Sequence, residues 1–324
     1  MVSKRMFVCA LLAAACGLGG SASAQSFPTK PIRMVVGFAP GGPADVMARL
    51  IGQRISGTLG QSVVIDNRPG AGGTIGARVV AESDPDGYTL LLGNTSTLVI
   101  SPLINKNVGY DPVKGFAPIA MLGTTSNLLI VNPGLGVTSV QELIALARAR
   151  PGKLNYSSAG IGTPPHLIGE MFKQRLGLDV VHVPYKGGGL STQAVVAGET
   201  QFSFENPAAS LPLVQAGNVR GLASTSETRG AQTPDLPTMI EAGVPDFTSV
   251  SFTAVVAPAG TPAAIVARLN AAINESLKSP EIGATLTKLD VDAKTSSPDE
   301  FAAFLARERD KWTTVIKTAG VQAE

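Results

Sequence analysis

The sequence predicts an α/β protein made of two lobes, with two chain crossings between them and a central cleft. Three observations carry this prediction. Apolar runs typical of buried strands alternate with stretches of helical spacing, which favours parallel sheets covered by helices on both faces. The chain of 324 residues is longer than one hydrophobic core usually organises. Two strand–proline–helix segments in its second half resemble each other and indicate the crossings.

The first residues predict a secretory signal peptide rather than part of the fold. Lys4 and Arg5 are followed by an apolar stretch at 7–18 and an A-x-A cleavage site at 22–24. We therefore expect an exported protein, with 1–24 as signal peptide. A lipoprotein acylated at Cys16 is the alternative.

Composition excludes several classes of function. Without the signal peptide, the basic residues equal the 24 acidic ones in number, so nothing indicates nucleic acid as a partner. Both cysteines would leave with the signal peptide, which removes disulfide and thiol chemistry. The two histidines lie in different elements without clustered carboxylates, so we expect no metal site. No nucleotide-binding motif or nucleophile elbow occurs, and we expect no cofactor.

The first strand, turn and helix form the most informative local pattern. Residues 32–38 predict a buried strand, Gly41 and Gly42 a tight turn, and Pro43 the first helical position. The first N–H groups of a helix lack partners and carry positive potential, so a small anion can bind there. The turn predicts half of a carboxylate site; an ordinary strand-to-helix connection is the alternative.

A second turn of the same kind follows the predicted strand at 154–157. Small residues occupy 158–163, and Pro164 and Pro165 suit a helix start. Ser158 and Thr163 add hydroxyl donors beside the free N–H groups. A dicarboxylate could thus be held from both sides.

The two similar segments divide the chain. Strands at 128–133 and 253–258 each end in proline, with helices expected from about Val140 and Ala263 and N-caps at Thr138 and Thr261. We therefore expect a first lobe of 25–127 and 252–324 and a second lobe of 128–251. Two crossings produce a cleft that can close.

Four titratable residues near these turns each allow two interpretations. His166 is a structural residue or a ligand contact, and His182 is a satisfied, partly buried strand residue. Asp45 would repel a carboxylate if it pointed inward, so a role at the start of its own helix is favoured. Glu205 could pair with a ligand ammonium group or could be a surface carboxylate.

The residues also carry a family resemblance that covers nearly the whole chain after the signal peptide. The chain resembles the Bug family, the periplasmic solute-binding proteins of tripartite tricarboxylate transporters. The motifs that carry it are FPTKPIRMVVGFAPGG (27–42), NRPGAGGTIGA (67–77), DPDGYTLL (84–91), GYDPVKGFAPIAML (109–122), SSAGIGTPPHL (157–167), VPYKGGG (183–189) and PTMIEAGVPDF (237–247).

The resemblance implies a two-lobe, type II-like periplasmic binding fold that closes on a small carboxylate, without catalysis. It implies membrane subunits of a transporter as partners, and we expect a monomer. The ligand-binding residues that it implies are Phe38, Ala39, Pro40, Gly41, Gly42, Thr95, Ser158, Ala159, Gly160, Gly162, Thr163 and Asn206. The alternatives are a binder that feeds a signalling receptor and an exported enzyme acting on carboxylic acids.

Overall fold

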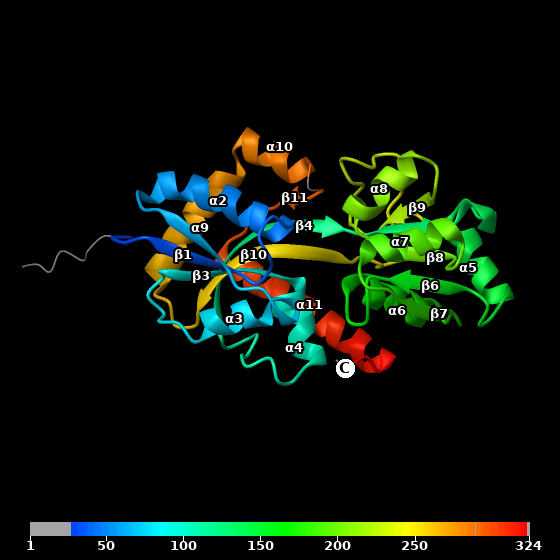
Figure 1. Ribbon diagram of the computed structural model, residues 1–324, viewed down its shortest axis with the longest axis horizontal. Helices are drawn as coiled ribbons and strands as arrows, with labels where there is room; N and C mark the ends of the chain where they lie inside the picture. The colour runs from blue at the N-terminus through cyan, green and yellow to red at the C-terminus, as the bar shows by residue number, and fades with distance from the viewer. Residues whose placement is uncertain (1–26, 289, 323–324) are drawn as a thin grey trace, which may run out of the picture.

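The computed structural model describes residues 27–288 and 290–322, which form two α/β lobes side by side (Figure 1). Each lobe contains one β-sheet with helices packed around it. The predicted fold class, a two-lobed α/β protein, is confirmed. The predicted signal peptide at 1–24 and the alternative acylation at Cys16 lie outside the described residues.

The first lobe holds a six-stranded sheet in the order β11-β4-β10-β3-β1-β2. Its strands are β1 (Ile32–Val36), β2 (Val63–Asn67), β3 (Thr89–Asn94), β4 (Phe116–Ser126), β10 (Val250–Pro258) and β11 (Asp292–Ala293). The second lobe holds a five-stranded sheet in the order β7-β6-β8-β5-β9. Its strands are β5 (Leu128–Val131), β6 (Asn155–Ser158), β7 (Val181–Pro184), β8 (Phe202–Glu205) and β9 (Arg220–Ser224).

The prediction of parallel sheets is wrong in one respect, because both sheets are mixed. In the first sheet β1 is parallel to β2 and β3, but β10 is antiparallel to β3 and β4. In the second sheet β6 is parallel to β7 and β8, whereas β5 is antiparallel to β8 and β9. β5 and β10 are the strands by which the chain enters each sheet from the other lobe. The neighbouring strands β3 and β8 end toward the other lobe, whereas β10 and β5 begin there, so each of the latter two runs antiparallel to its neighbour.

Helices cover both faces of the first sheet (Figure 1). The helical segments of this lobe are α2 (Pro43–Leu59), η1 (Ala71–Gly73), α3 (Thr74–Ala81), η2 (Ser96–Ile100), α4 (Ser101–Ile104), α9 (Ala263–Leu277), α10 (Pro280–Lys288) and α11 (Pro298–Ala319). The pleat of β1 divides the core between the two faces. Met34 packs in a cluster with Ile51 of α2 and Ile273 of α9, whereas Val35 belongs to the cluster that contains Val80 of α3.

The second lobe carries its helices in the same alternation with strands. They are η3 (Pro133–Leu135), α5 (Val140–Ala149), α6 (Pro164–Leu176), α7 (Gly188–Ala197) and α8 (Pro207–Gln215). The predicted helix starts at Val140 and Ala263 are confirmed, but both predicted N-caps are one residue too early. Ser139 caps α5 through a bond from the amide of Glu142, and α9 begins after Pro262. Thr261 instead donates its hydroxyl to the carbonyl of Pro258 and closes the preceding turn.

The C-terminal helix α11 connects the two lobes. It begins with a capping box formed by Ser297 and Glu300. Trp312 of this helix belongs to the core, because its side chain is fully buried. Beyond Trp312 the helix packs on α6 of the second lobe, where the Gln174 side chain donates to the Val315 carbonyl at 3.2 Å.

Candidate ligand-binding site

The strand registers place the turn after β1 and Thr95 on the side of the first sheet that faces the second lobe. β4 ends at Ser126, paired with the first residue of β10, and the chain passes directly from there into the second sheet. Asn94, at the end of β3, pairs with Thr253 near that same end of β10. Because β1 runs parallel to β3, the turn at 37–42 leaves the sheet at the same edge.

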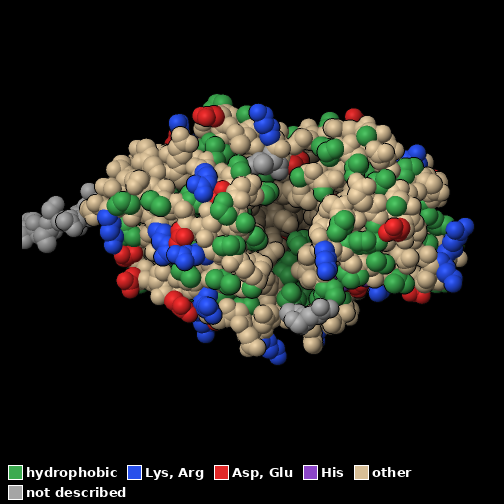
Figure 2. Space-filling model, viewed as in Figure 1, with side chains coloured by type: hydrophobic (Ala, Val, Ile, Leu, Met, Phe, Trp, Pro, Cys, Tyr) green, Lys and Arg blue, Asp and Glu red, His purple; other side chains and the backbone are tan. Residues whose placement is uncertain are grey.

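The same reasoning places the second turn at the facing edge of the second sheet. Leu128, the first residue of β5, pairs with Glu205, the last residue of β8. β6 runs parallel to β8, so Ser158, which ends β6, and Asn206, which follows β8, both lie at strand ends that point toward the first lobe. The surface is hollowed between the two lobes (Figure 2).

The turn of the first lobe is organised by Asp45, which is buried in the first turn of α2. Its Oδ2 accepts the N–H of Gly41 at 2.9 Å and the Nε of Arg49 at 2.9 Å. Its Oδ1 accepts the side-chain amide of Asn67 at 3.0 Å, and that amide also donates to the carbonyl of Phe38 at 3.1 Å. The carboxylate therefore links both ends of the turn to β2.

These contacts also set the charge of Asp45. The hydrogen bonds from Arg49 and from the Gly41 amide lower its pKa to about 2, although burial opposes them. The carboxylate is satisfied inside the protein and lies against its own helix start. This agrees with the favoured interpretation of Asp45 as a residue that stabilises the N-terminus of α2.

The turn of the second lobe is organised by His166, which is buried in the first turn of α6. Its Nδ1 accepts the N–H of Gly162 at 3.1 Å. The Gly160 carbonyl accepts the Thr163 hydroxyl at 2.6 Å, and the Gly160 amide donates to the Ser158 hydroxyl at 3.1 Å. The turn is thus closed by its own side chains and by the helix that follows it.

His182 of β7 contacts two residues of the same turn, Ser158 and His166. Its Nε2 lies 2.7 Å from the Ser158 hydroxyl, and its ring stacks on His166 with centroids 3.9 Å apart and planes 18° apart. Burial lowers the pKa of both histidines, that of His182 to about 3. Both rings are neutral near pH 7. The structural interpretation of His166 and the partly buried position predicted for His182 agree with these contacts.

The two turns share one five-residue pattern, glycine-X-proline-X-acceptor. In the first lobe it runs from Gly41 through Pro43 to Asp45, and in the second from Gly162 through Pro164 to His166. Both glycines have positive φ, +83° and +74°. In each case the side chain four residues later accepts the glycine N–H. Sequence reasoning missed this device, although the spacing of glycine, proline and acceptor was a readable signal.

The shared device decides which amides remain for a ligand. The N–H groups of Gly41, Gly160, Gly162 and Thr163 are all bonded inside their own turns. The amides that lack a partner within the described part of the chain are those of Gly42, Ala44, Asp45, Ala159, Ile161 and His166. They lie at the starts of α2 and α6, where the helix dipole favours an anion.

The remaining residues that were predicted for the site lie near the two turns, and two of them make local hydrogen bonds. Thr95 is buried, and its hydroxyl accepts the N–H of Phe252 at 2.8 Å, which ties the end of β3 to β10. The Asn206 Oδ1 accepts the N–H of Ala208 at 2.9 Å and so caps α8. Ala39 and Pro40 are exposed at the tip of the first turn.

Residues 47–321 match the sequence model of a protein family, the tripartite tricarboxylate transporter family receptor. The chain belongs to this family. BugT of Bordetella pertussis is 35% identical to it over 322 residues, which cover 99% of each chain. The resemblance to the Bug family is therefore confirmed, and with it the solute-binding role. The comparisons give no support to the sensory or the enzymatic alternative.

Two solved structures extend the comparison of this receptor. R. palustris Rpa4515 with adipate is 38% identical, with a TM-score of 0.76 over 91% of this chain and 99% of that one. MatC from Rhodopseudomonas palustris with bound malate is 32% identical, with a TM-score of 0.72 over 90% of this chain and 100% of that one.

The receptor also buries an acid at the interlobe edge. Glu205 is only 1% exposed, so its interpretation as a surface carboxylate is wrong. Its Oε1 accepts the Ser203 hydroxyl at 2.9 Å. Burial raises the pKa of Glu205 to about 7, although the hydrogen bond from Ser203 opposes this. No ion pair to Glu205 occurs within residues 27–288 and 290–322.

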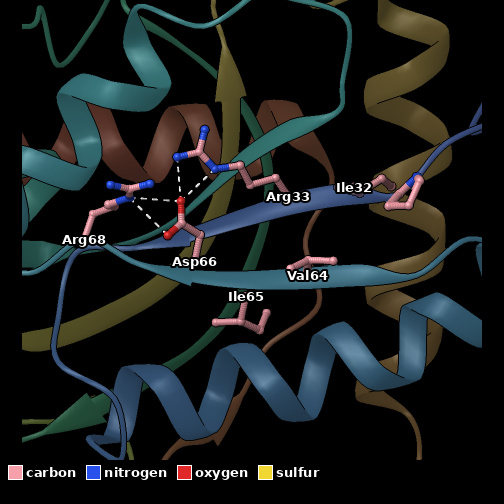
Figure 3. Close-up of a pocket in the computed structure, with 7 residues that line it drawn as sticks. Ile32, Arg33, Val64, Ile65, Asp66 and Arg68 are labelled. Atoms are coloured by element: carbon pink, nitrogen blue, oxygen red, sulfur yellow. Dashed lines mark hydrogen bonds and ion pairs between the residues drawn. The ribbon is translucent and has the colours of Figure 1, made fainter.

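A surface pocket of about 360 Å³ lies along β1 and β2 of the receptor (Figure 3). Arg33 and Arg68 converge there on Asp66, whose oxygens they reach at 2.8 and 3.0 Å. Burial would raise the pKa of Asp66, but the two arginines outweigh it and lower the pKa. Because both guanidinium groups are engaged by this carboxylate, the pocket offers a weaker anion site than the two turns.

Metal sites and membrane-spanning helices were both sought in the described part of this receptor. No group of three or more potential metal ligands occurs among the residues that the structure describes. None of the described helices combines the length and the apolar character that crossing a membrane requires.

Proposed function

We propose that the protein captures a small carboxylate between the turns at 38–42 and 158–163, with Thr95 and Asn206 lining the cleft. The observation that carries the proposal is the pair of matched turns on facing edges of the two sheets. At each turn a glycine amide is held internally while amides at the helix start lack a partner in the described residues. The donors of the site are thus the amides of Gly42, Ala44 and Asp45 in one lobe and of Ala159, Ile161 and His166 in the other.

The energetics of such a site suit a reversible binder. A hydrogen bond to a carboxylate contributes about 1.5–3 kcal/mol. Micromolar affinity needs about 8 kcal/mol net, so a few such bonds suffice after desolvation and ordering costs. Complexes of two relatives with adipate and with malate support a carboxylate as the ligand class.

The biological setting of the proposal is the periplasm. The pattern at the start of the chain is that of a signal peptide, and the family is one of transporter receptors. We propose that the loaded protein, as a monomer, delivers its ligand to the membrane subunits of a tripartite transporter. The lobes then comprise 25–127 with 252–324, and 128–251, and they close about the two crossings.

Removal of one amide tests the site. Gly42 has φ −78° and ψ 168°, a conformation that proline adopts, so Gly42→Pro removes the N–H without backbone strain at that residue. Gly42→Ala keeps the N–H, and its added Cβ would come no closer than 3.6 Å to the Ala39 carbonyl oxygen. Calorimetry with di- and tricarboxylates and acidic amino acids is done on protein freed of co-purified ligand.

The two Gly42 variants are expected to differ in their affinity for the ligand. We expect Gly42→Pro to weaken binding about tenfold or more, and Gly42→Ala to bind like the parent protein. Equal affinity for all three proteins would exclude the turn at 38–42 from the site. Failure of the parent protein to bind any acid of the panel would contradict the proposed function.

A further inference from the structure

The two matched turns differ in the chemistry of the group that holds the glycine amide. Asp45 is an anion whose partners are Arg49 and Asn67, and its lowered pKa of about 2 keeps it an acceptor across the pH range in which histidine titrates. His166 is a neutral imidazole that accepts through Nδ1. An imidazole that gains a proton has two N–H groups and no acceptor, so its bond to Gly162 requires the neutral ring.

We propose that His166 is the positioning residue of the second turn. Protonation of His166 then weakens the binding of the ligand by the second lobe and leaves the first lobe unaffected. The proposal rests on the proposed function, since it assumes that the turn at 158–163 contacts the ligand. Protonated His166 would oppose the Gly162 N–H with a second donor. The turn would then have to move, and the neighbouring amides of Ile161 and His166 would move with it.

The stacked His182 fixes the neutral arrangement of the turn and disfavours a second positive charge beside His166. His182 is bonded to the Ser158 hydroxyl, which in turn lies within hydrogen-bonding distance of the Gly160 amide and carbonyl. Its ring lies against His166, so a charge on one ring disfavours a charge on the other. The pair therefore keeps the turn in one arrangement until a proton enters at His166.

The surroundings of His166 place this event below the ordinary histidine range. Its own helix supplies Glu170, which opposes the effect of burial on the pKa, and Lys173, which adds to it. From β6, the Tyr156 hydroxyl donates to Glu170 and reaches the backbone carbonyl of His166. From β7 comes His182. α11 also packs on α6, and the hydrogen bond between these two helices lies further along, where the Gln174 side chain donates to the Val315 carbonyl.

The test compares His166→Asn with the parent protein. The Asn Oδ1 takes the place of Nδ1 as an acceptor and does not titrate. Adipate affinity is measured by calorimetry from pH 8 to pH 4.5. Each protein serves as its own reference at pH 8, and we expect the parent protein to lose about tenfold more affinity than His166→Asn between pH 8 and pH 4.5. Titration of adipate itself affects both proteins equally and cancels in the comparison.

Removal of the acceptor supplies the second arm of the binding test. His166→Leu leaves the Gly162 N–H unsatisfied, so its adipate affinity should be at least about tenfold lower at every pH. An identical pH profile for the parent protein and His166→Asn would overturn the proposal. So would a His166→Leu variant that is folded by circular dichroism and binds like the parent protein.

Nitrogen-15 NMR without ligand separates this proposal from the proposed function. We expect unprotonated Nδ1 in His166 at pH 8, and a Gly162 amide signal that shifts with the same midpoint as the His166 ring. The Gly41 amide, held by Asp45, should not share that midpoint. If no acid of the panel binds but the Gly162 signal follows the protonation of His166, the proposed function fails and the positioning role stands. A Gly162 signal that ignores the protonation of His166 would refute the role.

Discussion

Gly162 of the second lobe and Ile104 of the first lobe are in direct contact. The Cδ1 of Ile104 in α4 lies 2.7 Å from the position that a Cβ on Gly162 would occupy. The absence of a side chain at Gly162 is thus required twice, once for its positive φ and once for the approach of the two lobes. The turn that we assign to ligand binding is also a point at which the lobes meet.

Gly162→Ala should therefore weaken both the fold and the binding of a ligand. The positive φ costs about 1–2 kcal/mol for a residue with a Cβ, and the clash with Ile104 must be relieved by a shift of the Ile104 side chain or of the two lobes. We expect the double variant Gly162→Ala, Ile104→Ala to regain affinity but not stability. Calorimetry and urea unfolding measure the two effects separately.

Gly136→Ala is the matched control for backbone strain. Gly136 has φ +77°, and nothing lies within 4 Å of its added Cβ. It should lose a similar amount of stability while its affinity for the ligand stays unchanged. If Gly162→Ala also keeps its affinity, the contact with Ile104 has no part in binding.

Glu205 predicts an unusual dependence of stability on pH. Its folded pKa of about 7 lies above the ordinary value of 4.5, so the unfolded chain loses this proton more readily. The stability from the protonated form is complete below about pH 4.5 and is lost as the pH rises through 7. Glu205→Gln, which keeps an acceptor for Ser203, should be more stable than the parent by up to about 3 kcal/mol at pH 8.5 and similar to it at pH 5.

Glu142→Gln serves as a control of opposite sign in the same unfolding experiments. Hydrogen bonds from the amide and hydroxyl of Thr138 lower the pKa of Glu142. Its contribution is present at neutral pH and is lost as the pH falls below the ordinary range. A Glu205→Gln variant that changes stability equally at pH 5 and pH 8.5 would show that Glu205 is not the titrating group.

Trp312 should carry a large share of the attachment of α11. It is fully buried, and its indole N–H donates to Glu308 at 3.1 Å. Trp312→Ala should cost about 3–5 kcal/mol and Trp312→Phe less, because the smaller ring still fills part of the space. Urea unfolding followed by circular dichroism measures both. Lys317→Ala, at an exposed position of the same helix, should change stability by less than about 0.5 kcal/mol.

Local patterns predicted the elements of the fold well where one kind of signal dominated. Gly41, Gly42 and Pro43 predicted the turn and the start of α2, and the proline pair at 164–165 predicted the start of α6. Such residues act on their own backbone, so their effect does not depend on the rest of the chain. The two-lobed class followed from chain length and from the alternation of strands and helices.

The sequence did not predict which polar groups would be hydrogen-bonded inside the protein and therefore closed to a ligand. Glycine turns before helices predicted free amides, but Asp45 and His166 take the amides of Gly41 and Gly162. Glu205 could not be recognised as buried, because the β8 pattern does not show that α7 packs over the end of the strand. The direction of β5 and β10 likewise depends on where the chain enters each sheet.

The sequence by itself determined the class of the fold, the positions of the two turns and the family. Those features depend on backbone propensities and on motif order, which are properties of contiguous residues. Only the tertiary structure decided that the turns lie on facing edges, that Ile104 meets Gly162, and that His182 stacks on His166. These relations join residues far apart in the chain, and they arise from strand pairing and from the packing of side chains against one another.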